Sequence, residues 1–427
     1  SAPDLAGYRT ALWLAPVDGS EAARRLTLGA NHDGAPRWSP DGRHLAFLSD
    51  RGAILRAGGA ARDKEDLKLA SAPATGLKDL IGRDLPHGML QVWLLPMTGG
   101  EAQPLTDLPE DVTQLTWSPD SSRLCVVSAA TSAKRERPAK DAEEAPRRDA
   151  RLIDELGYQL NGAGFIYEQR SNLWIVDVAD GATRRLTSGR SRDGQPAWSP
   201  DGKRIAFEPD RGPNPDLSWR SGIYLVDVAG GKPVLVSSGE ERAFYHPAWS
   251  PDGKRIAAIG HRLESGNPTR EDVYVFRSRA GQQGTNLTAQ ADLYVDAAMN
   301  SDLYGPAPAG TQWSPDGESI YFNAPTDGSF ELWRVRLEDK RVERLTRGQH
   351  MLVLPSIAAA GKGLVVAAVR GTATAPPDVV AFGLSAPKKD PAKPVRPTAM
   401  RKLSELMASA WADIELVEPQ EVWTKVD

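Results

Sequence analysis

The sequence predicts an all-β protein built from repeated four-stranded sheets, and three observations support this prediction. The tetrapeptide Trp-Ser-Pro-Asp occurs five times, a strand-like segment with an aromatic residue recurs after each copy, and a Leu-Thr pair lies 11 residues before three of the tryptophans. Four strands per repeat, joined by a link of constant length, are typical of the blades of a β-propeller. We therefore expect a seven-bladed β-propeller of antiparallel four-stranded blades, with an incomplete first blade.

The Trp-Ser-Pro-Asp tetrapeptide predicts a tight turn between two strands. Proline presets the backbone for the second turn position, Asp suits the third, and the Gly that follows four of the copies accepts the positive φ that closes the turn. An apolar stretch of strand length follows each copy, so each copy marks a β-hairpin. The recurrent positions are Trp38, Trp117, Trp198, Trp249 and Trp313, with Asp41, Asp120, Asp201, Asp252 and Asp316 in the turns. We expect all ten to be structural, the tryptophans filling the wedge between neighbouring sheets rather than lining a ligand channel.

The number of blades follows from the third-strand segment. This segment occurs seven times, from Leu12-Trp13-Leu14 to a degenerate copy at 379–382, whereas the hairpin occurs only six times. The sixth hairpin is degenerate, at 354–356 and 363–368, and the hairpin that should precede Trp13 is absent. Either the chain is trimmed at its N-terminus, which we favour, or a C-terminal strand completes the first blade.

The predicted domain organisation is a propeller over residues 1–412 and a connecting strand over 413–427. Wide spacings between the first three tryptophans indicate insertions between second and third strands, at about 51–88 and 129–151. Both insertions are charged and neither has a clear apolar face, which favours solvated loops, the alternative being a partner-binding arm or lid. A Pro- and Lys-rich stretch at about 387–397 predicts an extended connection.

Composition excludes several classes of function. The 427 residues carry a formal net charge of -4, so no basic surface predicts binding to nucleic acid, and no apolar run is long enough to predict a membrane span. The single cysteine, Cys125, excludes an intrachain disulfide and fits a reducing compartment. We expect a cytoplasmic protein, while the missing initiator Met leaves a periplasmic or secreted location open.

No catalytic residue, metal site or cofactor site is predicted in this chain. The nucleophile elbow G-x-S-x-G is absent, and its nearest approximation, around Ser191, lacks the second Gly. The six histidines form no metal-spaced pair, and no phosphate-binding glycine motif occurs. Cys125 lies in an apolar strand and is expected to be a core residue. Substrate-binding residues are not identified by the sequence.

A combination of segments is more specific than the turn motif. These segments are Leu12-Trp13-Leu14, Arg25-Leu26-Thr27, the hairpin from Ala35 to Arg51, Gly157-Tyr158, Gly162-Ala163-Gly164-Phe165 and Val417-Glu418-Pro419-Gln420-Glu421-Val422. Together they resemble the N-terminal propeller of acylaminoacyl peptidases, within the prolyl oligopeptidase family of serine peptidases, over almost the whole chain. The turn motif alone also marks periplasmic propellers associated with translocation, so the resemblance rests on the combination.

The resemblance implies that the chemistry resides in a C-terminal α/β-hydrolase domain absent from this chain, so that no catalytic residue of the family can be carried over. It implies a propeller that restricts entry to short peptides, in a protein that removes acylated residues from peptide N-termini. The implied partners are that hydrolase domain and short peptides, and homo-oligomeric assembly stays open. The alternative is a free-standing propeller that binds a partner protein.

Overall fold

The computed structural model describes residues 10–29, 31–51, 90–130, 153, 156–160, 164–165, 170–209, 211, 217, 220–239, 242–266, 269–296, 310–361, 363–385, 395–405 and 414–424. The predicted insertions at about 51–88 and 129–151, and most of the predicted connection at about 387–397, lie outside these described residues. Over the described ranges every regular element longer than a single residue is a β-strand. No helix there is long and apolar enough to cross a membrane.

Four sheets contain four antiparallel strands each, which confirms the all-β prediction. Their strands are β3 (Asp33–Trp38), β4 (His44–Ser49), β5 (Gln91–Pro96) and β6 (Gln103–Pro104); β7 (Val112–Trp117), β8 (Arg123–Ala130), β11 (Arg170–Asp177) and β12 (Thr183–Arg185); β13 (Gly194–Trp198), β14 (Arg204–Glu208), β15 (Tyr224–Asp227) and β16 (Val234–Leu235); and β17 (Ala243–Trp249), β18 (Arg255–His261), β19 (Asp272–Arg277) and β20 (Thr285–Asn286).

Two further four-stranded units are joined by a short parallel contact between Phe330 and Met351. Their strands are β21 (Gln312–Trp313), β22 (Ser319–Thr326), β23 (Ser329–Arg336) and β24 (Val342–Arg344), then β25 (Met351–Ala360), β26 (Gly363–Thr372), β27 (Ala375–Leu384) and β28 (Arg401–Lys402). Two small sheets pair β1 (Trp13–Leu14) with β2 (Arg24–Arg25), and β9 (Gln159–Leu160) with β10 (Gly164–Phe165). The degenerate hairpin predicted around 354–368 is thus present as β25 and β26.

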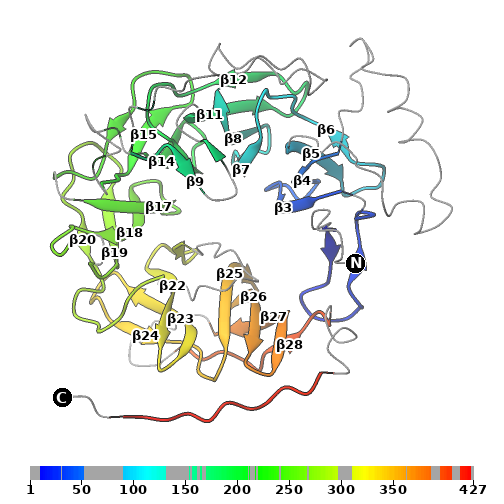
Figure 1. Ribbon diagram of the computed structural model, residues 1–427, viewed down its shortest axis with the longest axis vertical. Coiled ribbons are helices and arrows are strands. Elements are labelled where there is room, and N and C mark those ends of the chain that lie inside the picture. The colour runs from blue at the N-terminus through cyan, green and yellow to red at the C-terminus, as the bar shows by residue number, and fades with distance from the viewer. Residues whose placement is uncertain are drawn as a thin grey trace.

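The five Trp-Ser-Pro-Asp hairpins share one register. In each, the tryptophan pairs with the residue seven positions later, as in Trp117 with Leu124 and Trp198 with Ile205. Figure 1 shows the sheets arranged around a ring, with first strands such as β7, β17 and β25 nearest the centre and fourth strands such as β12, β20 and β24 at the periphery. Because the strands are antiparallel, the Ser-Pro-Asp turns lie at one face of the ring, and the links between sheets lie at the other.

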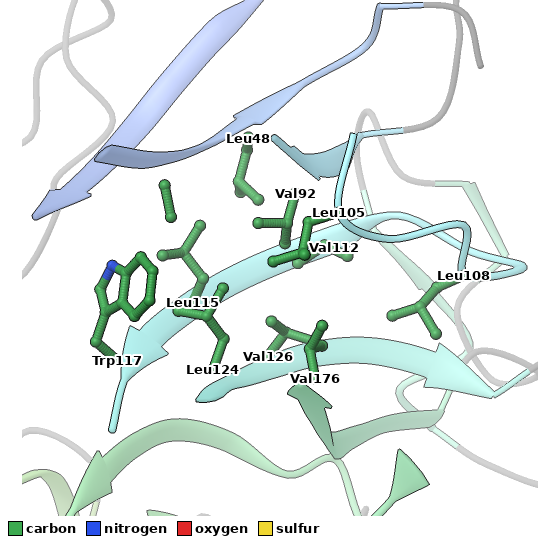
Figure 2. Packing of buried hydrophobic residues seen from close by; sticks show 11 residues of the cluster. Leu48, Val92, Leu105, Leu108, Val112, Leu115, Trp117, Leu124, Val126 and Val176 are labelled. Atoms are coloured by element: carbon green, nitrogen blue, oxygen red, sulfur yellow. The ribbon is translucent and has the colours of Figure 1, made fainter. Parts of the chain in front are cut away.

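Apolar side chains of consecutive sheets fill the space between them. Six clusters of buried residues each draw on two neighbouring sheets, from the one that joins Leu12 to Phe47 to the one that joins Leu332 to Phe382. Figure 2 shows the cluster in which Leu48 and Val92 of one sheet meet Leu115 of the next. The core is therefore a series of interfaces between sheets, as expected for stacked blades.

The first and last units meet beside one another in the ring (Figure 1). The side chain of Arg401, in β28, donates a hydrogen bond to the main-chain carbonyl of Asp18, between β1 and β2. Over the described ranges no strand is shared between these two units, and β1 pairs only with β2. The chain segment 414–424 then runs past the outer edge of the ring (Figure 1), where Glu418 accepts from Thr374 and Glu421 accepts from Gln349.

Candidate functional site

Each Ser-Pro-Asp turn is stapled by its own side chains. The Ser hydroxyl donates to the Asp carboxylate two residues later, at 2.5 to 2.6 Å in all five turns. The same carboxylate accepts from a main-chain amide beyond the turn, for example from Ser122 to Asp120 at 3.0 Å. The Ser118 hydroxyl and the Ser122 amide lower the pKa of Asp120 to about 2, because they stabilise the ionised form. Serine hydroxyls likewise lower the pKa of Asp41, Asp201 and Asp252.

Four of the turn tryptophans clamp their sheet to the preceding one. Each indole Nε1 donates to a main-chain carbonyl of the previous innermost strand, at 2.9 to 3.2 Å, as from Trp117 to Arg37 and from Trp249 to Ala197. An arginine of the preceding sheet covers three of the indole rings, Arg204 lying 5.0 Å from the ring centroid of Trp249. These tryptophans therefore lie between the sheets rather than in an open ligand channel.

Trp38 departs from the predicted packing. Its side chain is 48% exposed, against 7% for Trp117 and 8% for Trp198. The other four tryptophans reach the innermost strand of the preceding sheet, whereas the sheet that precedes Trp38 contains only β1 and β2 over the described ranges. The expectation that all five tryptophans fill a wedge between sheets is thus wrong for Trp38, because over the described ranges no innermost strand precedes it.

A position with positive φ recurs near the innermost strands, three residues before four of the five tryptophans. Ala35, Gln195 and His246 adopt positive φ there, of 49°, 51° and 54°, and Gly310 takes the equivalent place in the next unit. Gln195 donates its main-chain amide to the Gln114 side chain at 2.7 Å, and its own side chain accepts from the His246 amide at 2.5 Å. Burial lowers the pKa of His246 to about 4, so this imidazole is neutral at neutral pH. Side chains thus bridge three consecutive innermost strands.

Two buried ion pairs hold the start of an innermost strand to the end of its hairpin partner. Arg51 donates to both carboxylate oxygens of Asp33, at 3.1 and 2.7 Å, and Arg211 donates to those of Asp193, at 2.7 and 2.6 Å. Burial raises the pKa of Asp193, an effect that the Arg211 charge partly offsets. In both pairs the two residues are 18 positions apart and lie at the link face. The pairs therefore connect the same ends of the first and second strands in two different sheets.

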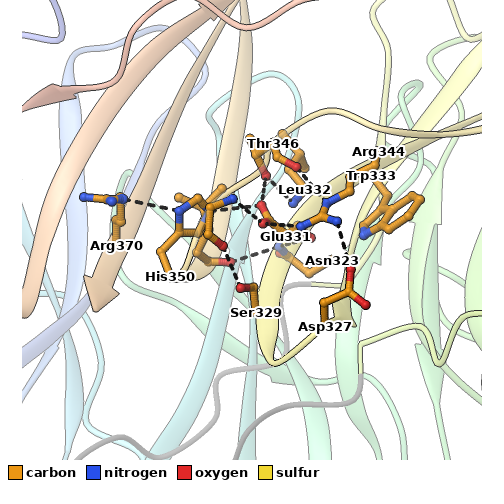
Figure 3. Close-up of polar contacts among 12 residues, drawn as sticks. Asn323, Asp327, Ser329, Glu331, Leu332, Trp333, Arg344, Thr346, His350 and Arg370 are labelled. Atoms are coloured by element: carbon orange, nitrogen blue, oxygen red, sulfur yellow. Dashed lines mark hydrogen bonds and ion pairs between the residues drawn. The ribbon is translucent and has the colours of Figure 1, made fainter. Parts of the chain in front are cut away.

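A cluster of polar side chains lies between the last two units (Figure 3). The Glu331 carboxylate is fully buried and accepts from Arg344 at 2.9 Å, from the Gly348 amide at 3.0 Å, and from the Thr346 hydroxyl. Its other partner is Nε2 of the buried His350, at 2.9 Å. Burial raises the pKa of Glu331, but hydrogen bonds from His350, Thr346 and Arg344 outweigh it, so the net pKa is lowered.

A cavity of about 410 Å³ adjoins this cluster. Its lining comes from the link between the two units, from β26 and from the segment that precedes β28. The lining residues are Thr346, Arg347, Gly348, His350, Arg370, Pro397, Thr398 and Met400. The Arg370 Nε lies 3.5 Å from Nδ1 of His350. The cavity lining therefore combines arginine side chains with the apolar residues Pro397 and Met400.

The Glu331–His350 pair is not part of a hydrolytic triad over the described ranges. The Ser329 hydroxyl, drawn beside the pair in Figure 3, donates to the carbonyl of Gly348 at 2.6 Å, and Nδ1 of His350 faces Arg370 instead of a nucleophile. The Ser191 hydroxyl donates to Asp193. Burial raises the pKa of the Cys125 thiol, which keeps it protonated and unreactive. Groups of three or more potential metal ligands do not occur among the described side chains.

Sequence reasoning did not identify the Glu331 cluster. One signal was available in the sequence. A polar residue lies 15 or 16 positions before the Thr of three Leu-Thr pairs, and its side chain accepts a hydrogen bond from that Thr hydroxyl. These residues are Gln91, Asp272 and Glu331. The position is therefore a recurrent anchor for the fourth strand. Nothing in the repeat signals that His350 and Arg370 join it in the last unit.

Known proteins with similar sequences or folds include β-propellers. Residues 163–290 match the family of TolB β-propeller domains, PD40. Over 96% of the chain the fold is similar to half of the Pyrococcus horikoshii acylaminoacyl peptidase, with 17% identity and a TM-score of 0.61. The chain is a β-propeller that resembles the propeller portion of acylaminoacyl peptidases. The predicted resemblance is thereby confirmed.

Curated relatives of this propeller include proteins named as peptidases. The uncharacterized peptidase YuxL of Bacillus subtilis is 28% identical over 73% of the chain, and dipeptidyl-peptidase 5 of Porphyromonas gingivalis is 24% identical over 79%. The matches span only 42% and 44% of the length of these two relatives. An uncharacterized protein of Agrobacterium fabrum, Atu1656, is 26% identical over 67% of the chain, and that match spans 83% of its length.

Proposed function

We propose that this chain is the seven-bladed, substrate-gating propeller of a serine oligopeptidase of the acylaminoacyl peptidase type. The parent protein would remove acylated N-terminal residues from short peptides, and a separate C-terminal α/β-hydrolase domain would supply the catalytic Ser, Asp and His. The observation that carries the proposal is that relatives named as peptidases match the chain over less than half of their own length. The remainder of such proteins is long enough to hold a hydrolase domain.

The described geometry supports a gating role through rigidity. The tryptophan hydrogen bonds and the bridge from Gln114 to His246 tie consecutive sheets together near the ring centre. The Asp33–Arg51 and Asp193–Arg211 pairs each hold the first hairpin of one sheet together. A ring held at so many points admits an extended peptide more readily than a folded domain, because widening it would break several buried hydrogen bonds at once.

The test of gating uses the chain extended by its downstream coding sequence. An acetylated tripeptide is offered either free or as the blocked end of a stable folded protein. We expect cleavage of the free tripeptide and an intact folded substrate. Equal rates on both substrates would contradict gating while leaving the peptidase assignment standing, and no cleavage of either would contradict the assignment.

A free-standing binding propeller is the second candidate. The match to Atu1656 favours it, because that relative has little length beyond the matched region. A partner recovered specifically with the 427-residue chain, together with no hydrolase encoded downstream, would favour this candidate over the first.

A further inference from the structure

Arg370 faces a cavity without a carboxylate to neutralise it. Its cross-strand neighbour in the β26–β27 register is Asp378, whose oxygens are occupied by Ser404 at 2.8 Å and Lys402 at 2.9 Å. Within the part of the chain that the structure describes, no acidic side chain lies at ion-pair distance from Arg370 or from Arg347, the other arginine of the cavity. The cavity is thus lined by two arginines, the half-buried Arg370 and the exposed Arg347, and over the described residues neither has an acidic partner.

The orientation of Arg370 is set by a buried relay. The Glu331 carboxylate is ionised and can only accept hydrogen bonds, so the His350 Nε2 at 2.9 Å carries the proton. In the neutral imidazole this leaves Nδ1 as an acceptor, and Nδ1 lies 3.5 Å from Nε of Arg370. The contact uses only the Nε edge of the guanidinium, so the Nη groups stay available for a planar ligand. His350 and Glu331 thus act as positioning residues.

The rest of the cavity defines what kind of anion fits. A volume of about 410 Å³ exceeds what a single inorganic ion needs and lies within the range of sites for small organic ligands. The lining also includes the apolar residues Pro397 and Met400 and the hydroxyl-bearing Thr398. An anionic head with a short, partly apolar body matches this distribution.

We propose that the cavity between the last two units binds an organic carboxylate, of the kind that ends a short peptide, through Arg370 and Arg347. The planar guanidinium of Arg370 suits a carboxylate because two parallel N–H···O bonds can form. This site lies between two sheets and apart from the ring centre. The cavity and its arginines carry this inference. Only the choice of a peptide carboxylate as the ligand rests on the proposed function.

Calorimetric titration of the 427-residue chain tests the site with three probes: trialanine, trialanine amide and inorganic phosphate. We expect trialanine to bind, and the amide and phosphate to bind at least about tenfold more weakly, since the amide lacks the charge and phosphate lacks the body. Equal binding of the amide would overturn the proposal. Equal binding of phosphate would overturn the carboxylate assignment. No binding of trialanine would overturn both.

Variants locate the site. Arg370→Gln should weaken trialanine binding by about tenfold to a hundredfold. The affinity of Arg370→Lys should lie between those of Arg370→Gln and the parent, because lysine keeps the charge but cannot donate two parallel hydrogen bonds to one carboxylate. The matched control, Arg279→Gln, removes an exposed arginine from the turn between β19 and β20 and should bind like the parent. Unchanged binding by Arg370→Gln would overturn the assignment.

A second measurement protects the test against a variant that fails to fold. In the unaltered protein, the Nε–H resonance of Arg370 should shift with added trialanine and stay in place with the amide. A shift confined to other arginines would contradict the site. All readouts use the propeller alone, so failure here is distinguishable from failure of the peptidase assignment, which is read by hydrolysis in the extended protein.

Discussion

The indole Nε1 of Trp198 donates a hydrogen bond to the main-chain carbonyl of Thr116 at 3.2 Å, and the two residues belong to innermost strands of neighbouring sheets. The guanidinium of Arg123 covers the same ring at 5.6 Å from its centroid. One side chain thus joins hydrogen bonding, cation–π contact and apolar burial at a boundary between sheets. Since this arrangement recurs along the chain, it predicts how the ring responds when a clamp is removed.

Trp198→Ala should lower the free energy of unfolding by about 3 to 5 kcal/mol, as expected for truncating a large buried aromatic side chain. Trp38→Ala is the matched control, because Trp38 has the same sequence context but is half exposed, and it should cost less than about 1 kcal/mol. Urea melts followed by circular dichroism measure both values. Similar losses for the two variants would show that the slot before Trp38 is filled.

The hydrogen bonds between Ser and Asp in the turns predict that the stability of the protein depends on pH. The pKa of Asp120 is lowered to about 2 in the folded protein, so its contribution to stability is present above the ordinary pKa near 3.8 and is lost as pH falls toward 2. The stability difference between the parent and Asp120→Asn should therefore shrink between pH 4 and pH 2. Thermal melts across this range check the prediction. A stability difference that stays constant with pH would contradict a stabilising role of the ionised Asp120.

The inner bulge predicts a stabilising substitution. Ala35 holds a φ of 49°, which costs an ordinary residue about 1 to 2 kcal/mol and glycine almost nothing, although glycine loses about 0.5 to 1 kcal/mol of chain entropy. Ala35→Gly should therefore be neutral or raise the free energy of unfolding by up to about 1 kcal/mol. Ala197→Gly, on an innermost strand without positive φ, should lower it. Equal losses in chemical denaturation would mean that the bulge carries no strain.

The Asp193–Arg211 pair predicts a non-additive double variant. Arg211→Met leaves a buried carboxylate without its counter-charge and should cost about 3 to 5 kcal/mol at neutral pH. The double variant Asp193→Asn with Arg211→Met removes the stranded charge and should recover part of that loss. A double-mutant cycle by urea denaturation measures the coupling. Additive losses would show that the two side chains are solvated independently.

The repeat was readable from sequence because each strand boundary depends on local chemistry. Proline, Asp and Gly at 40–42 define a turn by themselves, and the Leu-Thr pair at 26–27 marks the end of a fourth strand through its hydroxyl contact with the third strand. Even the degenerate hairpin of the last unit was located, since residues 364–368 are an unbroken apolar run of strand length. In the structure Leu364, Val366 and Ala368 of this run are buried.

The remaining features depend on contacts that no local pattern encodes. The bulge residues Ala35, Gln195 and His246 share a backbone conformation but no chemical property, so nothing in their identity announces it. Exposure of Trp38 depends on the unit before it and not on its own motif. The relay through His350 joins two sheets, and such partners become visible only when the sheets are placed side by side.

The central claim is that this propeller serves a serine peptidase whose chemistry lies outside the chain, and active-site labelling with a fluorophosphonate tests it most directly. The 427-residue chain and the same chain extended by about 250 residues of downstream sequence, roughly one hydrolase-sized domain, are treated side by side. The account predicts no labelling of the first and stoichiometric labelling of one serine in the extension of the second. Labelling within residues 1–427, or an extension that carries no reactive serine, would contradict it.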